Sequence, residues 1–294
     1  MKTLFKKLLA IVGATASGKS DLSLILAKKF NGFVISADSR QLYRGMDIGT
    51  GKLPINARDG IRHEMLDILD PTQTFTLAQV QDAAHALIKK SVLLPILVGG
   101  TGLYIQAVVD NFSIPKVTPN PDRRKDWEKI SPEILFQKLA ALDPETAEVI
   151  DRHNKRRLIR ALEVVEATGQ SFRKQQRSNP IYDTLQIGLQ VEREILYDRI
   201  HARVDDMMDR GLLEEVRAVG SQYGWDCPGM SALGYRQLIP AVHNTTLLPQ
   251  CVEQLKKDTR RYAKRQLTWF RRDHRIQWVQ NADEATTLVQ QWLS

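Results

Sequence analysis

Gly13-Ala14-Thr15-Ala16-Ser17-Gly18-Lys19-Ser20 is the stretch of the chain that decides its fold. These residues match G-x-x-x-x-G-K-[ST], a loop whose glycines let the backbone close around phosphate groups. Successive backbone N–H groups and the N-terminus of the next helix point at the anion. Lys19 supplies a mobile positive charge, and the Ser20 hydroxyl is a candidate ligand of Mg²⁺. This phosphate loop predicts that a polyphosphate binds, but it does not identify the polyphosphate as ATP.

The residues around the loop supply the context that the motif requires. Residues 8–12 are predicted as a buried strand, and apolar residues from 22 to 27 recur at helical spacing. Further strands are predicted at residues 32–36, 93–98, 185–191 and 276–279, and a helix at residues 77–90. Alternating strands and helices predict an α/β fold with a mostly parallel sheet and helices on both faces.

Prolines at positions 115, 119 and 121 mark a change of pattern. Helical segments without a convincing strand follow at residues 122–130, 131–142, 144–150 and 155–168, with Gly169 as a helix stop. We therefore predict a helical insertion at residues 115–182. The α/β core would comprise residues 1–114 and 183–294 and would be like that of P-loop-containing nucleoside triphosphate hydrolases.

Three informative segments fall at predicted strand ends, where ligands bind in sheets of this class. They are the phosphate loop, Asp38-Ser39-Arg40-Gln41, and Gly99-Gly100-Thr101-Gly102. From position alone, Asp38 is a Mg²⁺ ligand, a general base or a helix cap. The glycine-rich segment either allows close approach of a ligand beside the Thr101 hydroxyl or forms only a tight turn.

The charge is concentrated in one segment near the C-terminal end of the chain. Residues 256–275 hold nine Lys or Arg against Asp258 and Asp273, which is +7 of a formal net charge of +8. A helix there would bury Ala263, Leu267 and Phe270 and present a basic side. Such a side fits a nucleic-acid phosphate backbone better than a merely solvated face, which usually has mixed signs. A second basic cluster spans residues 152–160.

Other features set limits on the function. The two cysteines lie far apart without metal-ligand spacing, which indicates reduced thiols and a cytoplasmic location. The N-terminus imitates a signal peptide, but cleavage there would cut the phosphate loop, so we expect none. No apolar run approaches the roughly 20 residues that span a bilayer. His63 is expected to be structural. A helix is predicted over residues 197–217 with an interruption at Gly211. From sequence alone, its Arg199 and Arg203 could belong to a solvated face that pairs with Asp205, Asp206 or Glu192.

Taken together, these motifs resemble the tRNA dimethylallyltransferases (tRNA isopentenyltransferases) of bacterial type. The resemblance covers nearly the whole chain and rests on residues 13–20, 35–50, 63–71, 98–104, 156–164, 199–216, 234–237 and 259–266. It implies transfer of a dimethylallyl group from dimethylallyl diphosphate to N6 of adenosine 37, next to the anticodon, with Mg²⁺ as cofactor. Residues 13–20 would then cradle the departing diphosphate, with no need for ATP.

The resemblance also implies residue roles. Asp38 is the general base, Thr101 lies between the diphosphate and the entering base, and Arg203 and Lys19 stabilise the growing charge. The implied contacts with the tRNA anticodon stem-loop are Asp38, Ser39, Arg40, Gln41, Thr101, Arg124, Arg156, Arg157, Leu158, Ile159 and Arg160. The target adenine is expected to leave its stack, and the family suggests a monomer. Ala14 stands where the family usually has proline, and Ser20 replaces the commoner threonine.

Two other functions remain open at this point. An ATP-dependent small-molecule kinase would use Asp38 as base and the arginine-rich insertion as a lid, but it would not need the basic helix. A P-loop RNA-binding ATPase would normally have a strand ending in an aspartate, whereas the predicted strand at residues 93–98 ends in Gly99-Gly100.

Overall fold

The computed structural model describes residues 5–115, 117–118, 120–173 and 178–294, and the chain forms two compact units. Unit 1 comprises Met1–Val109 and Ile181–Ser294, and unit 2 comprises Asp110–Pro180. The sequence predicted an insertion at residues 115–182. Unit 2 begins earlier than this prediction, at Asp110, and ends at Pro180. The reason is that the Asp110 carbonyl accepts bonds from the Ser178 hydroxyl at 3.0 Å and the Asn179 N–H at 2.9 Å.

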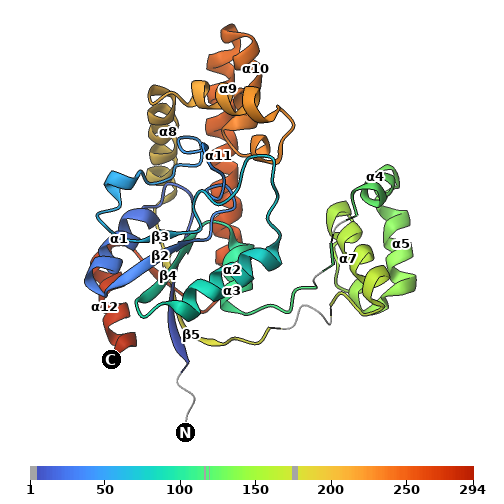
Figure 1. Ribbon diagram of the computed structural model, residues 1–294, viewed down its shortest axis with the longest axis horizontal. Coiled ribbons are helices and arrows are strands. Elements are labelled where there is room, and N and C mark those ends of the chain that lie inside the picture. The colour runs from blue at the N-terminus through green and yellow to red at the C-terminus, as the bar shows by residue number, and fades with distance from the viewer. Residues whose placement is uncertain (1–4, 116, 119, 174–177) are drawn as a thin grey trace. The chain divides into compact units, whose positions relative to one another are not determined.

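A parallel sheet with strand order β3-β2-β4-β1-β5-β6 forms the centre of unit 1 (Figure 1). Its strands are β1 (Lys6–Val12), β2 (Gly32–Ser36), β3 (His63–Glu64), β4 (Leu94–Gly99), β5 (Tyr182–Leu189) and β6 (Ile276–Val279). All adjacent strands pair in parallel, which confirms the predicted α/β class. The sequence did not predict β3, because two residues are too few to show a period.

Strand β5 differs most from its predicted limits of 185–191. It begins at Tyr182 because the polar residues Tyr182 and Asp183 pair with Lys6 and Lys7 of β1. It ends at Leu189, and the next residue only donates one hydrogen bond to the Val279 carbonyl at 2.9 Å. Polar side chains at the start of the strand therefore hid its true beginning.

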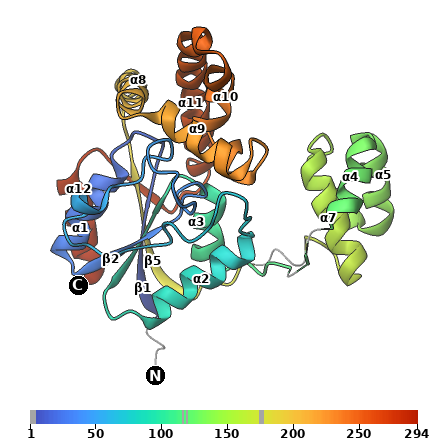
Figure 2. The same cartoon turned by 45° about the horizontal axis from the view of Figure 1, so that its top comes forward.

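Helices cover both faces of the sheet (Figures 1 and 2). One face is covered by α1 (Lys19–Lys29) and α12 (Ala282–Leu293), and the other by α2 (Leu77–Lys90) and α3 (Gly102–Val109). Alternate residues of β1 serve the two layers, as expected for a strand. Leu9 and Ile11 join the cluster with α1 and α12, whereas Leu8 and Ala10 join the larger cluster on the opposite face.

The helices from α8 to α11 gather at one end of the sheet (Figure 2). They are α8 (Arg193–Asp209), α9 (Leu212–Tyr223), α10 (Tyr235–His243) and α11 (Leu248–Phe270). The sequence predicted one helix over residues 197–217 with an interruption at Gly211. Gly211 in fact separates two helices, because its backbone is left-handed with φ 91°.

The regular structure of unit 2 is helical wherever its residues are described, as predicted. It contains α4 (Pro121–Lys129), α5 (Pro132–Leu142), α6 (Pro144–Ala147) and α7 (Lys155–Thr168). Proline opens three of these helices, where its missing N–H costs nothing. Trp127, Leu135, Leu139 and Leu162 lie in the buried core of this unit. Gly169 ends α7 in the left-handed conformation, with φ 66°.

Candidate active site

The phosphate loop connects β1 to α1 in the way that its sequence predicts. Gly13 and Gly18 take φ angles of 149° and 94°, which L side chains rarely adopt. Gly18 is the residue before the first turn of α1, so the helix N-terminus opens at the loop. The Ser17 hydroxyl is buried and has no hydrogen-bond partner among the described residues. The loop therefore presents backbone N–H groups and a spare hydroxyl to an anion.

Lys19 lies close to other charged groups of the site. Its ammonium group donates to the Ala14 carbonyl of the same loop. Burial and the nearby Arg203 guanidinium lower the pKa of Lys19 to about 8, and Asp38 acts in the opposite direction. The positive charge of the loop is therefore weakened by its surroundings until an anion arrives.

A cavity of about 590 Å³ opens over the phosphate loop. Residues from the loop, from the ends of β2 and β4 and from α8 and α11 line it. Its lining residues include the cationic Lys19, Arg199, Arg203 and Arg210 and the acidic Asp21, Asp38 and Asp206. The cavity thus has the charge and the backbone donors that a diphosphate with a divalent cation needs.

Arg203 lies against the backbone of Gly51. A Cβ atom at position 51 would lie 1.7 Å from Nη2 of Arg203, and Gly51 has φ +61°. Burial lowers the pKa of Arg203, while the Asp38 carboxylate raises it. Asp205, suggested by sequence as a partner on a solvated face, instead pairs with Lys256 at 2.7 Å. Arg203 therefore belongs to the site and not to a solvated face.

Asp38 and Thr101 come together because β2 and β4 are neighbours in the sheet. The two strand ends approach so closely that a Cβ at Gly99 would lie 2.4 Å from the Ala37 carbonyl. Asp38 Oδ1 accepts the Arg40 N–H at 2.8 Å, and Thr101 Oγ1 accepts the Ser39 N–H at 3.2 Å. The bond from the Arg40 N–H occupies only one oxygen of the Asp38 carboxylate. The other oxygen, Oδ2, has no hydrogen-bond partner within the described part of the chain.

A second cavity of about 360 Å³ adjoins the first. The two share six lining residues: Thr15, Asp38, Thr50, Arg203, Met207 and Tyr262. Thr101 and several apolar side chains line only the second cavity; the latter include Ile200, Val204, Leu233 and Leu255. The site therefore has a charged part at the phosphate loop and a partly apolar part beyond it, with Asp38 and Arg203 in both.

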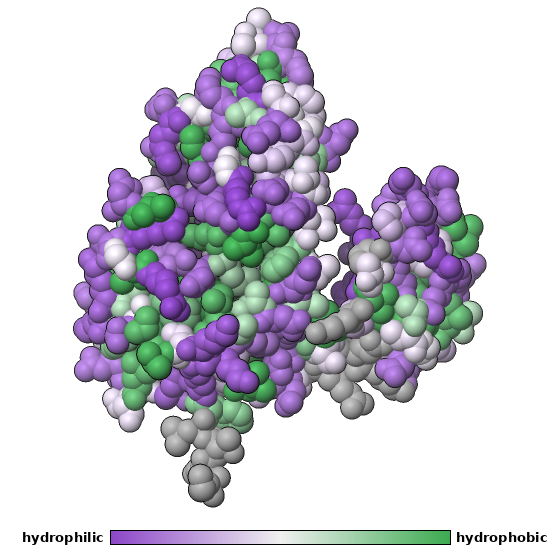
Figure 3. Space-filling model, in the orientation of Figure 1, coloured by the Kyte–Doolittle hydropathy of each residue, from purple (hydrophilic) through white to green (hydrophobic). Residues whose placement is uncertain are grey.

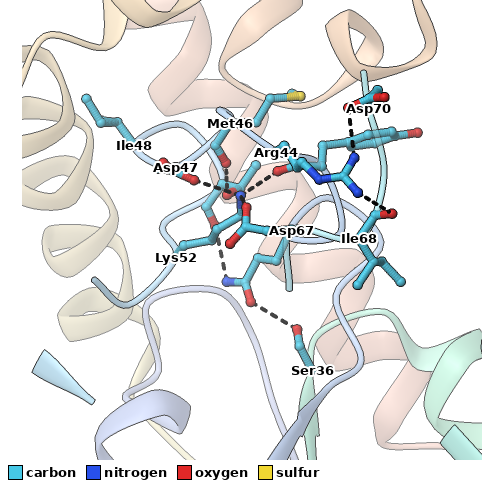
Figure 4. A network of polar contacts seen from close by, with 12 residues as sticks. Ser36, Arg44, Met46, Asp47, Ile48, Lys52, Asp67, Ile68 and Asp70 are labelled. Atoms are coloured by element: carbon cyan, nitrogen blue, oxygen red, sulfur yellow. Dashed lines mark hydrogen bonds and ion pairs between the residues drawn. The ribbon is translucent and has the colours of Figure 1, made fainter. Parts of the chain in front are cut away.

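The segment between Asp38 and β3 is held in place from within (Figure 4). The ammonium group of Lys52, whose side chain is 3% exposed, bonds to Asp47 at 2.7 Å, to Asp67 and to the Tyr43 carbonyl. Gln41 accepts a bond from the Ser36 hydroxyl at 3.0 Å and donates to the Gly51 carbonyl at 3.4 Å. These bonds fix the backbone on which Arg203 rests.

Replacing Lys52 should therefore destabilise the protein. Lys52→Met leaves the buried Tyr43 carbonyl and two carboxylates without their donor, which should lower the free energy of unfolding by about 1–3 kcal/mol. Urea denaturation followed by circular dichroism measures this change. Lys28→Met removes the exposed Lys28–Asp59 pair and should cost at most about 0.5 kcal/mol. Equal losses in the two variants would contradict the assignment.

A carboxylate on α9 supports the same segment from the other side. Glu215 accepts backbone N–H bonds from Asp47, Ile48 and Gly49 at 2.8–2.9 Å, as well as the Tyr235 hydroxyl. Burial and Glu215 strongly raise the pKa of Tyr235. This arrangement ties the packing of α9 and α10 to the backbone beside Arg203.

The basic segment that the sequence singled out is only partly available to a partner. Lys256 pairs with Asp205, Arg261 pairs with Asp258 at 3.5 Å, and Arg275 pairs with Asp273 at 2.6 Å. Lys257, Lys264, Arg265, Arg271 and Arg272 are not placed in any ion pair within the described residues, and Lys264 and Arg265 are exposed. The opposite side of α11 is buried at Ala263, Gln266 and Phe270. The helix therefore carries a basic outer side, as predicted, with a smaller charge surplus.

Residues 156–160 of α7 split into two groups. Arg156 and Arg157 are exposed, whereas Leu158 and Ile159 are buried in the core of unit 2. The side chains of Leu158 and Ile159 face inward because of their place in the helical repeat. Their predicted contact with RNA stays a prediction, and it would have to be made by the backbone.

Two other predicted contact residues of unit 2 have structural partners. Arg124 binds both oxygens of the buried Glu163 carboxylate at 2.7 Å, and Arg160 bonds to Glu163 at 3.2 Å and to the Val117 carbonyl at 3.0 Å. These bonds lower the pKa of Glu163, although its burial acts in the opposite direction. Arg124 and Arg160 thus connect α4, α7 and the segment before α4.

His63 does not line either cavity. His63 is half-buried beside the Ile61 carbonyl, which lies 2.8 Å from Nδ1, and burial lowers the pKa of its ring. No group of three His, Cys, Asp or Glu side chains in the described chain is arranged to hold a metal ion. Among the described helices, none is long and apolar enough to cross a membrane. The face seen in Figure 3 is mostly hydrophilic, with scattered hydrophobic areas.

Sequence reasoning did not assign site roles to Tyr262, Gln266 and Arg210. All three line the first cavity. Tyr262 and Gln266 stand four residues apart on α11, so one face of the basic helix reaches the site. Burial and the Asp38 carboxylate raise the pKa of Tyr262 to about 12. In the sequence, the spacing of four between Tyr262 and Gln266 indicates that they share a helix face. It does not indicate that this face reaches the site, because that depends on the position of the helix.

The fold and the site define a phosphate-loop enzyme of the α/β class. The model of the IPP transferase family matches residues 41–273, and a tRNA dimethylallyltransferase of Anoxybacillus flavithermus is 43% identical over 285 residues. That alignment covers 95% of this chain and 92% of the relative. The chain belongs to the tRNA dimethylallyltransferase (IPP transferase) family.

Solved structures agree with this placement. The crystal structure of the full-length tRNA isopentenylpyrophosphate transferase of Bacillus halodurans is similar with a TM-score of 0.74 and 39% identity, and the match covers 98% of this chain and 95% of that one. A eukaryotic dimethylallyltransferase, solved in crystallographic snapshots while acting on tRNA, is similar with a TM-score of 0.78 and 31% identity. That match covers 90% of this chain and 69% of the eukaryotic one.

Proposed function

We propose that the protein transfers the dimethylallyl group of dimethylallyl diphosphate to N6 of adenosine 37 in tRNA and releases diphosphate. The family makes it a tRNA dimethylallyltransferase. The observation that carries the mechanism is that Asp38 and Arg203 line both cavities. The diphosphate would lie over the phosphate loop in the first cavity. The dimethylallyl group and the adenine would meet in the second.

The charged cavity suits a departing diphosphate. As the allylic C–O bond breaks, negative charge grows on the leaving oxygen. Loop N–H groups, Lys19 and Arg203 would stabilise this charge more in the transition state than in the ground state. The buried Ser17 hydroxyl, which lacks a partner among the described residues, offers one further donor.

Asp38 is placed to act on the acceptor. The exocyclic amine of adenine is a weak nucleophile because its lone pair is delocalised into the ring. The Asp38 carboxylate, held at Oδ1 by the Arg40 N–H, would orient the amine through Oδ2 and accept its proton. Thr101 lies on the neighbouring loop and lines the same cavity, so its hydroxyl would contact the entering base.

The apolar part of the second cavity suits the dimethylallyl group. Ile200, Val204 and Leu255 are each at most 3% exposed, and all line this cavity. Such a wall would exclude water from the allylic carbon, where water would compete with the amine. Its size is enough for a five-carbon chain beside a purine.

The residues of the first cavity fit Mg²⁺. The ion prefers oxygen ligands and commonly takes one or two from the protein, the rest coming from phosphates and water. The Ser20 hydroxyl at the start of α1 would hold it together with the donor diphosphate, and Asp21, Asp38 and Asp206 lie around the same cavity. When bound, the ion would neutralise charge on the diphosphate.

One assay separates the three functions considered. Unmodified tRNA is incubated with radiolabelled dimethylallyl diphosphate and Mg²⁺, without ATP. Label in the tRNA, located at adenosine 37 by nuclease digestion, is the expected result. Absence of label would overturn the proposal. Phosphate transfer from ATP to a metabolite, or ATP hydrolysis stimulated by tRNA, would support the kinase or the ATPase instead.

Binding of inorganic pyrophosphate should depend on the protonation of Lys19. Because the pKa of Lys19 is lowered to about 8, the free protein loses this charge as pH rises through 8. Calorimetry should show that Lys19 contributes about tenfold less to pyrophosphate affinity at pH 9 than at pH 7. Pyrophosphate itself also changes its ionisation over this pH range. This change affects wild type and Lys19→Met alike, so it cancels in the ratio of their Kd values. A ratio that does not change with pH would contradict the assignment.

The exposed arginines of α7 are proposed to bind the tRNA anticodon stem-loop. Arg157→Ala should weaken tRNA binding and lower the slope of log K against log salt by about one, without changing the melting temperature. Arg124→Ala is the matched comparison, because it leaves the buried Glu163 carboxylate short of a partner and should lower stability. Filter binding and thermal melting measure the two effects. Unchanged tRNA affinity in Arg157→Ala would remove Arg157 from the interface.

A further inference from the structure

Gln266 of α11 connects two loops of the site. Its Oε1 accepts the Thr15 N–H at 2.8 Å, and its Nε2 donates to the Gly100 carbonyl at 2.9 Å. The residue is only 5% exposed, so water does not replace these bonds easily. One amide group therefore ties the phosphate loop, at the end of β1, to the loop at the end of β4.

The loop after β4 is shaped to rest on α11. A Cβ at Gly100 would lie 2.0 Å from Nε2 of Gln266, and a Cβ at Gly102 would lie 2.2 Å from the Trp269 ring. Between them, the Thr101 side chain lies near the Tyr262 hydroxyl and partly offsets the rise that burial causes in the Tyr262 pKa. Tyr262, Gln266 and Trp269 follow one another at spacings of four and three, which places them on one helix face. Three consecutive loop residues thus contact three turns of the same helix.

The Gln266 bond also restricts the phosphate loop itself. The Thr15 N–H is already bonded to Gln266, so it is not one of the donors that hold a phosphate. Its bond instead sets where the loop begins its curve around the anion. The amide of Gln266 contacts backbone on both sides and needs no substrate to hold it in position.

We propose that Gln266 is a positioning residue that fixes the spacing between the phosphate loop and the Thr101 loop. This inference rests on the proposed function, in which the first loop holds the leaving diphosphate and the second borders the entering adenine. Without the bridge, the two loops could move apart while each still bound its own ligand. Misplacement of reacting groups by 1 Å costs on the order of 100-fold in rate. The basic outer side of α11 would connect RNA binding to the same two loops.

Gln266→Leu tests the proposal, because it keeps the size of the side chain and removes both bonds. We expect kcat to fall about 100-fold, with the Kd for inorganic pyrophosphate and for tRNA within about threefold of wild type. The control is Gln250→Leu, the same change at an exposed position of the same helix, which should behave like wild type. A folded Gln266→Leu variant with kcat within about threefold of the control would overturn the proposal.

Gln266→Glu supplies a readout that a purely structural role would not give. A protonated carboxyl can accept from Thr15 and donate to Gly100, as the amide does, whereas a carboxylate can only accept. Burial raises the pKa of a carboxyl group, so protonation should occur at moderately acidic pH. The ratio of kcat in this variant to kcat in wild type should therefore increase as pH is lowered from 8.5 to 6. A ratio independent of pH would overturn the proposal, even if Gln266→Leu does not fold.

The wild-type protein in the same assay separates the two claims. If wild type transfers no label from dimethylallyl diphosphate to tRNA, the proposed function fails. If wild type is active and both Gln266 variants match it, only the role of Gln266 fails.

Discussion

Asp38→Ala is expected to lower kcat for dimethylallyl transfer by about 10²–10⁴-fold, the range typical of a positioned general base. The carboxylate lies in both cavities, and its Oδ1 is held by the Arg40 N–H. Its loss removes the group that would accept the N6 proton. The phosphate loop is untouched, so the KM for dimethylallyl diphosphate should change little. Steady-state kinetics with varied donor and saturating tRNA measures both parameters.

Asp38→Asn separates proton transfer from placement. The amide keeps the size of the side chain and can still accept the Arg40 N–H, but it is far too weak a base to take the proton. We therefore expect Asp38→Asn to lose nearly as much kcat as Asp38→Ala. A rate near wild type in Asp38→Asn would show that Asp38 only orients the acceptor. A large increase in the KM for dimethylallyl diphosphate would show instead that Asp38 helps to bind the diphosphate.

Arg203→Met is expected to lower kcat about 10²–10³-fold, the cost of removing one donor from a developing oxyanion. The guanidinium lies against Gly51 and beside Lys19 in the charged cavity. Because the charge on the leaving oxygen grows in the transition state, the loss should fall more on kcat than on donor affinity. Single-turnover rates and pyrophosphate binding measure the two effects separately.

Two further variants test the geometry of Arg203. Arg193→Met changes an exposed arginine at the start of the same helix and should leave kcat unchanged. Gly51→Ala keeps the guanidinium but places a Cβ 1.7 Å from Nη2, at a φ of +61° that alanine rarely adopts. Gly51→Ala should therefore lower kcat, as Arg203→Met does. Full activity in Gly51→Ala would show that the contact with Gly51 does not set the position of Arg203.

Sequence patterns were sufficient for the elements with a strong local signal. The phosphate loop, β2 and α2 lie where the sequence predicted them, because glycine spacing, a buried apolar run and a capped amphipathic helix are all local features. The predicted limits of β5 were wrong, and the short strand β3 was not predicted. Both depend on pairing with distant strands, and polar residues such as Asp183 give no sign of that pairing.

The candidate site divides in the same way. Asp38 and Thr101 were predicted because each follows a buried strand, and parallel strands end at one edge of the sheet. Their proposed catalytic roles stay predictions. The buried positions of Leu158 and Ile159, and the bonds of Arg124 to Glu163, were not predicted, because a run of residues in a motif does not show which side of its helix faces the core.

By itself, the sequence determined that this protein has a phosphate loop on a parallel α/β sheet, a helical insertion and a basic C-terminal helix, and it indicated the family. These follow from glycine spacing, hydrophobic period and charge, which are properties of neighbouring residues. Only the tertiary structure decided that Gln266 bridges Thr15 and Gly100, that Gly51 supports Arg203, and that two cavities meet at Asp38. The residues in these contacts lie far apart along the chain, and no local pattern records which of them will meet.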